Sequence, residues 1–297
     1  FDTASLVKTG SDRNADDIAE RLEQENVSRE FVVADASLAT GSSVLLSSHA
    51  HNAGIFTARG ANTALVSGDL AEAAFERDLV FISGLSNESA DCFPDVIARA
   101  SAAGARIATN PGIRQLSSRA DEFFGCLDRI SILTLNRLES EQLVPRLIAG
   151  GTADQRSTIK PAGNPNSLVD RGLMAGGFNL PFDSYVRAIT SLGVEMLLVT
   201  NGSDGAYVGT ADAIWHCTVP SVEVAGTAGA GDAFASTFAG MMTTGASIED
   251  ALKSATCNAG SVVSHLDTQT GLLTREGLAE RVAKFEDRLL VTRWDIG

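Results

Sequence analysis

From residue 79 onward, short apolar runs alternate with helix-like segments, and this alternation constrains the fold more than any other feature of the chain. The apolar runs cover residues 79–82, 105–108, 130–133 and 196–200, and the helix-like segments lie near residues 90–103, 114–125, 137–148 and 182–192. The runs are continuously apolar, which is typical of strands that are buried on both faces. The rhythm therefore predicts an α/β fold, with a mostly parallel central sheet covered by helices on both faces.

Two regions interrupt this rhythm. Residues 31–66 alternate apolar and polar side chains without a good helix pattern, so we expect an antiparallel β excursion there that forms a small lid. Residues 150–181 are rich in Gly, Pro, Asn and Ser, and we expect them to form a long surface loop. The sequence contains no internal repeat, and we expect residues 1–297 to form a single domain.

The charge balance and the cysteines exclude several classes of protein. The chain carries 23 Lys and Arg against 37 Asp and Glu, a net charge of −14. Nucleic acids and anionic membranes need a basic face, so neither is expected as the main partner. No apolar run approaches the roughly 20 residues of a membrane helix. The four cysteines are isolated, which predicts reduced core thiols in a cytoplasmic protein.

The segment from Ala225 to Phe234 carries the strongest chemical signal. Its small residues lead into the start of an apolar helix, with Asp232 in the first turn. A glycine-rich turn before a helix exposes unpaired backbone amides, which form an anion site together with the helix dipole. A helix cap explains Asp232 alone, but it does not explain the preceding Gly-Ala-Gly. An acid beside an anion site suits phosphoryl transfer, in which the carboxylate accepts a hydroxyl proton.

These residues resemble the motifs of a known family. Gly229 to Asp232 reads Gly-Ala-Gly-Asp, which resembles the signature of the ribokinase-like (PfkB) carbohydrate kinases. Asn136 to Glu139 is similar to the family's Asn-x-x-Glu motif, and Thr200 to Gly205 is similar to its nucleotide loop. Each motif follows a predicted strand, and similar segments cover nearly the whole chain. The resemblance implies a ribokinase-like three-layer α/β/α sandwich and an ATP-dependent kinase that phosphorylates a hydroxyl of a sugar or nucleoside.

The resemblance also implies a role for each matched residue. Asp232 is then the catalytic base, with Gly229, Ala230 and Gly231 as the anion hole. The residues implied in binding ATP are Asn136, Thr200, Gly202, Ser203, Gly205, Thr227 and Asn258. Glu139 is implied as the Mg²⁺ residue, and K⁺ is a further candidate as a monovalent cation.

The chain departs from the family in several places. The family's opening strand with a substrate-binding Asp is not found, nor is its Gly-Gly segment, so we expect the family's N-terminal segment to be absent. Gly226 stands where many members have Asp, which bears on the cation site, and Thr256 stands where many have Asn. Asp12, Arg59 and Asn62 lie in regions expected to approach the substrate. By analogy with relatives, the lid is expected to form a homodimer.

Other functions remain as alternatives at this stage. The main one is a non-catalytic ligand-binding relative of the same fold. A dinucleotide oxidoreductase needs Gly-x-Gly-x-x-Gly after an early strand, and a P-loop kinase needs Gly-x-x-x-x-Gly-Lys-Ser/Thr; the sequence contains neither. Taken alone, Asn136 and Glu139 are better explained as a helix cap and a solvent-facing acid. His49 and His51 would share one strand face, but a third zinc ligand is missing, so we expect a lid or surface role.

Overall fold

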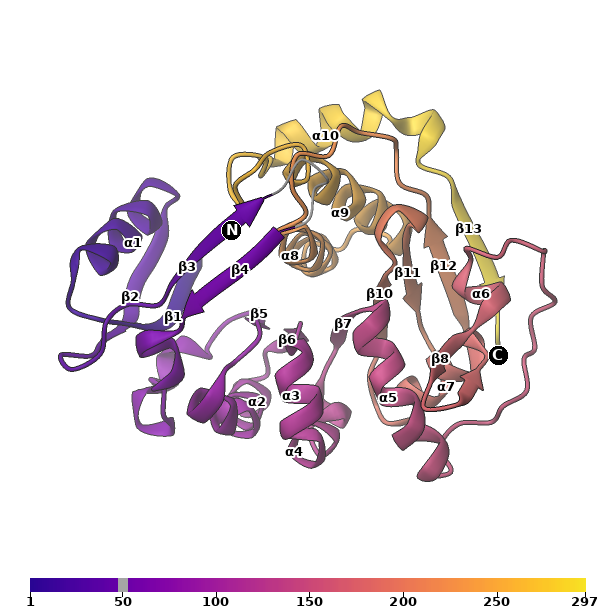
Figure 1. The fold of residues 1–297 in the computed structure, drawn as a ribbon, viewed down its shortest axis with the longest axis horizontal. Coiled ribbons are helices and arrows are strands. Elements are labelled where there is room, and N and C mark those ends of the chain that lie inside the picture. The colour runs from indigo at the N-terminus through magenta and orange to yellow at the C-terminus, as the bar shows by residue number, and fades with distance from the viewer. Residues whose placement is uncertain (48–52) are drawn as a thin grey trace.

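The computed structural model describes residues 1–47 and 53–297, and its centre is a seven-stranded sheet (Figure 1). The strand order is β13-β12-β11-β10-β7-β6-β5. The strands are β5 (Leu79–Ile82), β6 (Arg106–Thr109), β7 (Ile132–Asn136), β10 (Met196–Thr200), β11 (Ala206–Gly209), β12 (Ala213–Cys217) and β13 (Val291–Asp295). Strands β5, β6, β7 and β10 pair in parallel, and β11 to β13 add an antiparallel edge. The four predicted apolar runs are thus the parallel strands.

Helices cover both faces of this sheet (Figure 1). One layer contains α2 (Phe93–Ala102), α3 (Gly112–Ser118), α4 (Ala120–Phe124), α5 (Arg137–Ala149) and α7 (Phe182–Ser191), and the other contains α8 (Ala230–Thr243), α9 (Ile248–Val262) and α10 (Arg275–Lys284). Successive residues of β10 point to opposite layers: Leu197 and Val199 pack in one core, and Met196 and Leu198 in the other. The predicted three-layer α/β class is confirmed.

The N-terminal part of the chain forms a β-α-β unit that the sequence analysis did not predict. Strands β1 (Thr3–Thr9) and β2 (Val27–Ala34) pair in parallel, and α1 (Arg13–Gln24) connects them. The expectation of an antiparallel excursion from residue 31 is therefore wrong at its start, because residues 31–34 belong to β2. The apolar pattern of residues 31–34 could not reveal strand β2, because its partner strand β1 is separated from it in the sequence by helix α1.

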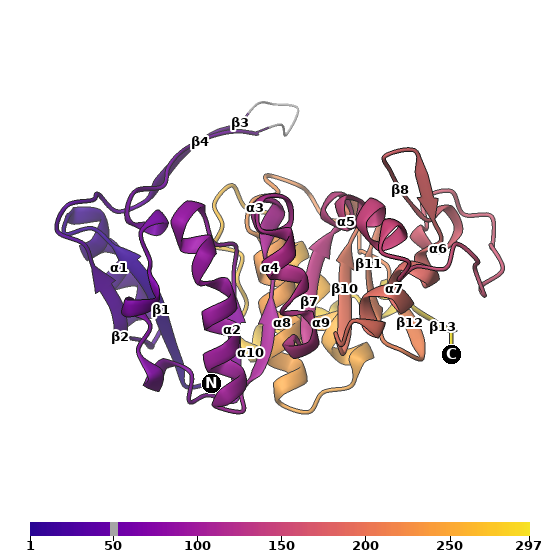
Figure 2. The same ribbon diagram turned by 90° about the horizontal axis from the view of Figure 1, so that it is seen from below.

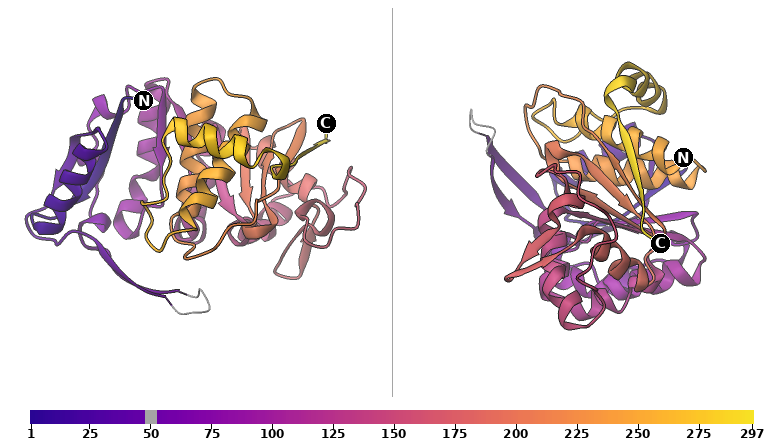
Figure 3. Two further views of the ribbon diagram at one scale, coloured as in Figure 1. Left: turned by 90° about the horizontal axis from the view of Figure 1, so that it is seen from above. Right: turned by 90° about the vertical axis from the view of Figure 1, so that its right-hand side faces the viewer.

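The antiparallel excursion itself is a hairpin, shorter than the predicted residues 31–66. Strands β3 (Ser42–Ser47) and β4 (Ala53–Ala58) pair in antiparallel. The hairpin stands away from the helical layers (Figures 2 and 3), and both of its strands carry exposed apolar side chains. The position matches the expected small β lid. His49 and His51 lie outside the described residues.

The glycine-rich region 150–181 is not simply a surface loop, as the sequence suggested. It contains the short helix α6 (Leu168–Arg171) and a hairpin of β8 (Leu173–Ala175) and β9 (Phe178–Leu180). Leu168, Leu173 and Leu180 are completely buried. The Gly residues that suggested a loop serve as turn residues here, and Gly176 and Gly177 between the two strands both have positive φ.

The expectation of free, buried cysteines agrees with the structure. Cys92, Cys126, Cys217 and Cys257 are all buried and free. No helix within the described ranges has the length and apolar character needed to cross a membrane.

Candidate active site

A cleft of about 1030 Å³ opens where β7 and β10 end. It lies at the carboxyl ends of parallel strands, where open α/β sheets bind their ligands. Eight of the predicted site residues line it: Asn136, Thr200, Gly202, Ser203, Gly205, Thr227, Ala230 and Gly231. Segments far apart in the sequence are therefore brought together around one cavity.

The predicted anion site, residues 229–231, lies at the start of helix α8. Gly229 precedes the helix in a left-handed conformation, with φ of 79°. A Cβ atom on Gly229 would lie 2.9 Å from Thr268 Cβ, so both the backbone angle and the close approach require glycine. On Gly231, by contrast, a Cβ would meet no heavy atom of the described residues within 4 Å. Ala230 and Gly231 both line the cleft, and the first amides of a helix have no acceptor within it, so an anion in the cleft could bind there.

Asp232 lies in the first turn of α8, directly after Gly231. The residue is exposed, and its carboxyl group has no hydrogen-bond partner among the described residues. Desolvation by the surrounding protein raises the pKa of Asp232 above its ordinary value. A carboxylate with a raised pKa and no partner is suited to accept a proton from a ligand.

Asn136 and Glu139 cap helix α5 reciprocally. The Glu139 backbone N–H donates to Asn136 Oδ1 at 2.9 Å, and the Asn136 backbone N–H donates to Glu139 Oε2 at 2.8 Å. The cap that served as the simpler explanation is therefore present. Glu139 is also buried, however, and desolvation raises its pKa against the lowering effect of the Asn136 bond.

Glu139 follows the lining residues Asn136, Arg137 and Leu138 in the chain but is not itself part of the cleft lining. Its capping bond uses only Oε2, which leaves Oε1 for a metal-bound water. The described residues contain no cluster of three His, Cys, Asp or Glu side chains that could enclose a metal. Mg²⁺ does not need such a cluster, because it keeps several waters and takes one or two carboxylates together with substrate phosphates.

The loop after β10 is held in place by the neighbouring strand β12. Gly205 has φ of 102°, and a Cβ there would lie 2.4 Å from the Cys217 carbonyl oxygen. His216 Nε2 lies 2.8 Å from the Asp204 carbonyl oxygen. Gly202 has φ of 59° as well. Both glycines are therefore required turn residues, and both also line the cleft.

The opposite wall of the cleft is apolar and was not predicted. Its side chains come from the segment after β12 and from α9: Val219, Val222, Val224, Ala259 and Val263. The alternation of Val222 and Val224 in the sequence was the available signal. Asn258 is not part of the lining, because its amide donates to Thr237 Oγ1 at 2.8 Å and accepts from the Leu273 N–H at 3.0 Å. Thr256 lines the cleft instead.

The three residues expected near the substrate lie at the base of the β3–β4 hairpin, outside the cleft lining. Asp12 accepts hydrogen bonds from the backbone N–H of Thr40 at 2.8 Å and from its Oγ1 at 2.7 Å. Arg59 Nη1 donates to Ser86 Oγ at 2.8 Å. Asn62 packs close to Gly41, where its Nδ2 would lie 2.5 Å from an added Cβ. These contacts anchor the two ends of the hairpin to the body.

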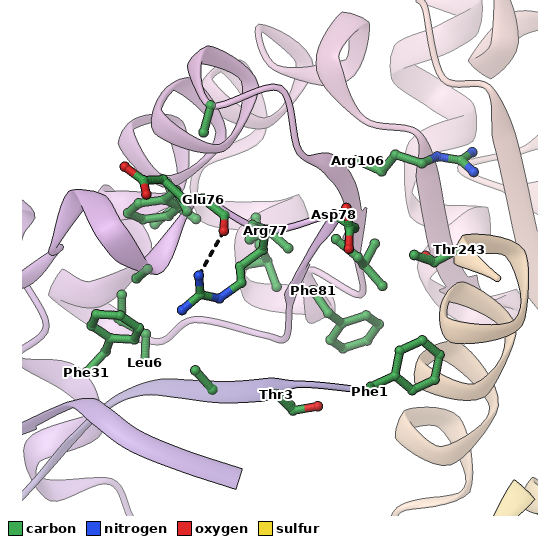
Figure 4. Close-up of a pocket in the computed structure, with 18 of the residues that line it drawn as sticks. Phe1, Thr3, Leu6, Phe31, Glu76, Arg77, Asp78, Phe81, Arg106 and Thr243 are labelled. Atoms are coloured by element: carbon green, nitrogen blue, oxygen red, sulfur yellow. Dashed lines mark hydrogen bonds between the residues drawn. The ribbon is translucent and has the colours of Figure 1, made fainter.

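A second cavity, of about 1190 Å³, lies between β1 and β5 (Figure 4). Leu6 and Phe81 point into it from the two strands. In the described residues, β1 pairs with β2 and β5 with β6, while no hydrogen bond joins β1 to β5. None of the predicted site residues lines this cavity, so the candidate active site is the cleft at the ends of β7 and β10.

The sequence profile of the pfkB family of carbohydrate kinases matches residues 1–172 and 183–275. The chain belongs to this family. Among curated proteins, no sequence matches the chain.

The solved structures that are similar to this pfkB family member have the ribokinase fold. The Arabidopsis thaliana ribokinase, complexed with ribose and ATP, is 20% identical with a TM-score of 0.71; the match covers 95% of this chain and 82% of that one. The Thermotoga maritima ribokinase is 18% identical with a TM-score of 0.71, covering 94% and 81%. The adenosine kinase of Sinorhizobium meliloti is 17% identical with a TM-score of 0.72, covering 95% and 77%. The predicted ribokinase-like fold is thus confirmed.

Proposed function

We propose that the protein is an ATP-dependent kinase that transfers the γ-phosphoryl group to a hydroxyl of a sugar or nucleoside. The observation that carries this proposal is that Asp232 directly follows Ala230 and Gly231, two residues at the start of α8 that line the cleft at the strand ends. Family membership and fold support it. The Arabidopsis thaliana ribokinase was solved with ribose and ATP. An Escherichia coli protein named as ribokinase II, 17% identical with a TM-score of 0.76, was solved with ATP and Mg²⁺.

In the proposed reaction, the Asp232 carboxylate accepts the proton of the acceptor hydroxyl as its oxygen attacks the γ-phosphorus. A P–O bond forms to the acceptor, the bond between the γ-phosphorus and the β-phosphate oxygen breaks, and ADP leaves. The amides of Gly229, Ala230 and Gly231 face the charge that is distributed over the phosphoryl oxygens. Small residues suit this role because a larger side chain would hold the phosphate away from the amides.

The remaining cleft residues bind and orient the nucleotide in this proposal. Thr200, Gly202, Ser203 and Gly205 follow the phosphates and ribose, while the apolar wall of Val219 to Val224 faces the base. Mg²⁺, when bound, neutralises phosphate charge and orients the γ-phosphoryl group. Glu139 would hold it through water, with Asn136 fixing the carboxylate by the capping bonds.

The test is steady-state kinetics with ATP and a panel of sugars and nucleosides, comparing the parent with Asp232→Asn. The substitution keeps the shape of the side chain and removes its basicity, so kcat should fall by about 10²–10⁴ while ATP affinity changes little. A parent that binds ligands but turns over no ATP would support the non-catalytic relative. A variant within about threefold of an active parent would remove Asp232 from the mechanism.

The same proposal includes a homodimer formed through the β3–β4 hairpin. Both strands carry exposed large apolar side chains, with exposed fractions of 60% for Val44, 59% for Leu46, 58% for Ile55 and 66% for Phe56. The hairpin stands off the body (Figure 2), so these side chains can meet a second copy without rearrangement of the body.

A further inference from the structure

The hairpin of β8 and β9 lies in a stretch of the chain that the pfkB profile does not match. The match to the pfkB profile stops at residue 172 and resumes at residue 183, and the unmatched stretch contains both strands. The strand β8 packs against helix α5, whose first residues border the candidate cleft. The hairpin also follows closely on the cleft lining, because Arg171, the last residue of the short helix α6, lines the cleft.

Hydrogen bonds fix the segment before the β8–β9 hairpin to strand β11 and to the nucleotide loop. The Leu168 backbone N–H donates to the Tyr207 hydroxyl at 3.0 Å. Asn201 Nδ2 donates to the Asn166 carbonyl oxygen at 3.3 Å. Leu168 itself is completely buried. Helix α6 is therefore anchored to the same loop that borders the cleft, and its last residue, Arg171, lies where its side chain can reach the cleft.

The hairpin closes tightly on the residue after Arg171. Gly172 has φ of 71°, and a Cβ there would lie 2.6 Å from the Leu180 carbonyl oxygen at the end of β9. Leu173 and Leu180 pair across the base of the hairpin, and both are completely buried. The backbone position of Arg171 is therefore determined by the hairpin on one side and by the nucleotide loop on the other.

Within residues 1–47 and 53–297, Arg171 is a cation of the cleft without a carboxylate partner. The charged residues of the lining are Arg137, Arg171 and Asp204. Arg137 is engaged by Glu141 at 2.8 Å. Arg171 forms no salt bridge with the described residues; its Nη2 lies 3.5 Å from Asn201 Oδ1, at the outer limit of a hydrogen bond. An exposed guanidinium is thus available beside Asn136, Thr200 and Gly202.

We propose that Arg171 binds the phosphate chain of the nucleotide, and that the β8–β9 hairpin holds it in position. The inference rests on the proposed kinase function. The chain has a net charge of −14, and the predicted site residues offer amides, neutral polar groups and the carboxylates of Asp232 and Glu139, so a polyphosphate in this cleft needs a cation such as Arg171 from elsewhere in the lining. A planar guanidinium can donate two hydrogen bonds to one phosphate group, which makes arginine a strong phosphate ligand.

The test measures equilibrium binding of MgATP, ADP and AMP to the parent, to Arg171→Gln and to Arg171→Lys. The Gln variant should weaken MgATP binding by about 10- to 100-fold, as expected for a lost bond between two charged groups. AMP binding should change less, because AMP lacks the outer phosphates. The Lys variant should recover part of the loss, since it restores the charge but not the planar fork. The control is Arg156→Gln, an exposed arginine of the same region that pairs with Asp154.

The outcomes separate the two proposals. If the parent binds no MgATP, the kinase function itself fails. If the parent binds MgATP and Arg171→Gln binds it equally well, or if the variant weakens AMP as much as ATP, the role of Arg171 is wrong while the kinase function stands.

A second comparison tests the role of the hairpin. Gly172→Ala should lower the ratio of MgATP affinity to AMP affinity, because the added Cβ displaces the backbone that carries Arg171. Gly151→Ala is the matched control: Gly151 also has a positive φ, of 68°, but a Cβ there meets no described atom within 4 Å. The ratio reports on phosphate binding independently of any general loss of stability. An unchanged ratio in Gly172→Ala would remove the hairpin from the proposal.

Discussion

Asp232 and Glu139 are both carboxyl groups whose pKa is raised by desolvation, and this fixes the direction of a pH effect. A base must be deprotonated to act, so kcat/KM should fall as the pH drops through the raised pKa of Asp232. The fall should begin at a higher pH than an ordinary Asp would give. The measurement is the pH profile of kcat/KM for the parent and the two isosteric variants. Asp232→Asn should lose this limb along with most of the activity, whereas Glu139→Gln should retain it. If this limb disappears in Glu139→Gln, the titrating group is Glu139 and not Asp232.

Glu139→Gln separates the metal role of this residue from its structural role. A glutamine can still accept the Asn136 N–H bond, so the cap on α5 and the melting temperature should change little. The lost charge should raise the Mg²⁺ concentration needed for half-maximal rate, while sugar binding stays the same. Asn136→Ala is the contrasting variant, because losing the cap should cost about 1 kcal/mol of stability. A Glu139→Gln enzyme with its full rate at low Mg²⁺ would contradict the assignment.

At the scale of secondary-structure elements, the exposed apolar side chains of the β3–β4 hairpin allow a test of the homodimer. Val44→Ser together with Phe56→Ser should convert the parent dimer into a monomer, because both side chains are more than half exposed in the single chain. The measurement is molar mass by light scattering over a range of concentrations. Leu290→Ser is the matched control, an exposed apolar residue (61%) that precedes β13 and lies away from the hairpin. A parent that is already monomeric, or a double variant that stays dimeric, would refute the role of the hairpin.

Elements buried on both faces could be predicted from the sequence, and elements whose stability comes from distant partners could not. The strands β5, β6, β7 and β10 appear as apolar runs because both faces are covered. Strand β1 is mostly half-exposed, so its apolar pattern is weak. Its partner β2 lies beyond helix α1 in the sequence. The β8–β9 hairpin was hidden by its turn glycines. In the cleft, the glycine-rich motifs were predictable because their conformations require glycine, whereas Arg171 reaches the site only through the three-dimensional placement of α6.

On the scale of the whole molecule, the body and the N-terminal β1–α1–β2 unit differ in how they are held. The body has two continuous cores, one on each face of the central sheet. Helix α1 has no buried residue. Contacts such as Lys8 Nζ to Asp69 Oδ2 at 2.8 Å and to the Ala64 carbonyl oxygen at 3.0 Å tie the unit to the rest. The N-terminal unit should therefore open more readily than the body.

The space between β1 and β5 has a consequence for how water reaches the backbone (Figure 4). A strand edge without a partner leaves its amides hydrated, and deuterium from the solvent can replace their protons without any unfolding. Amides of β1 and β5 that face this space should therefore exchange within the earliest time points of a hydrogen–deuterium experiment read by mass spectrometry or NMR. Those of β7 and β10, which pair on both sides, should exchange only through rare opening of the sheet. Equal protection of all four strands would mean that the facing edges of β1 and β5 are hydrogen-bonded in solution as well.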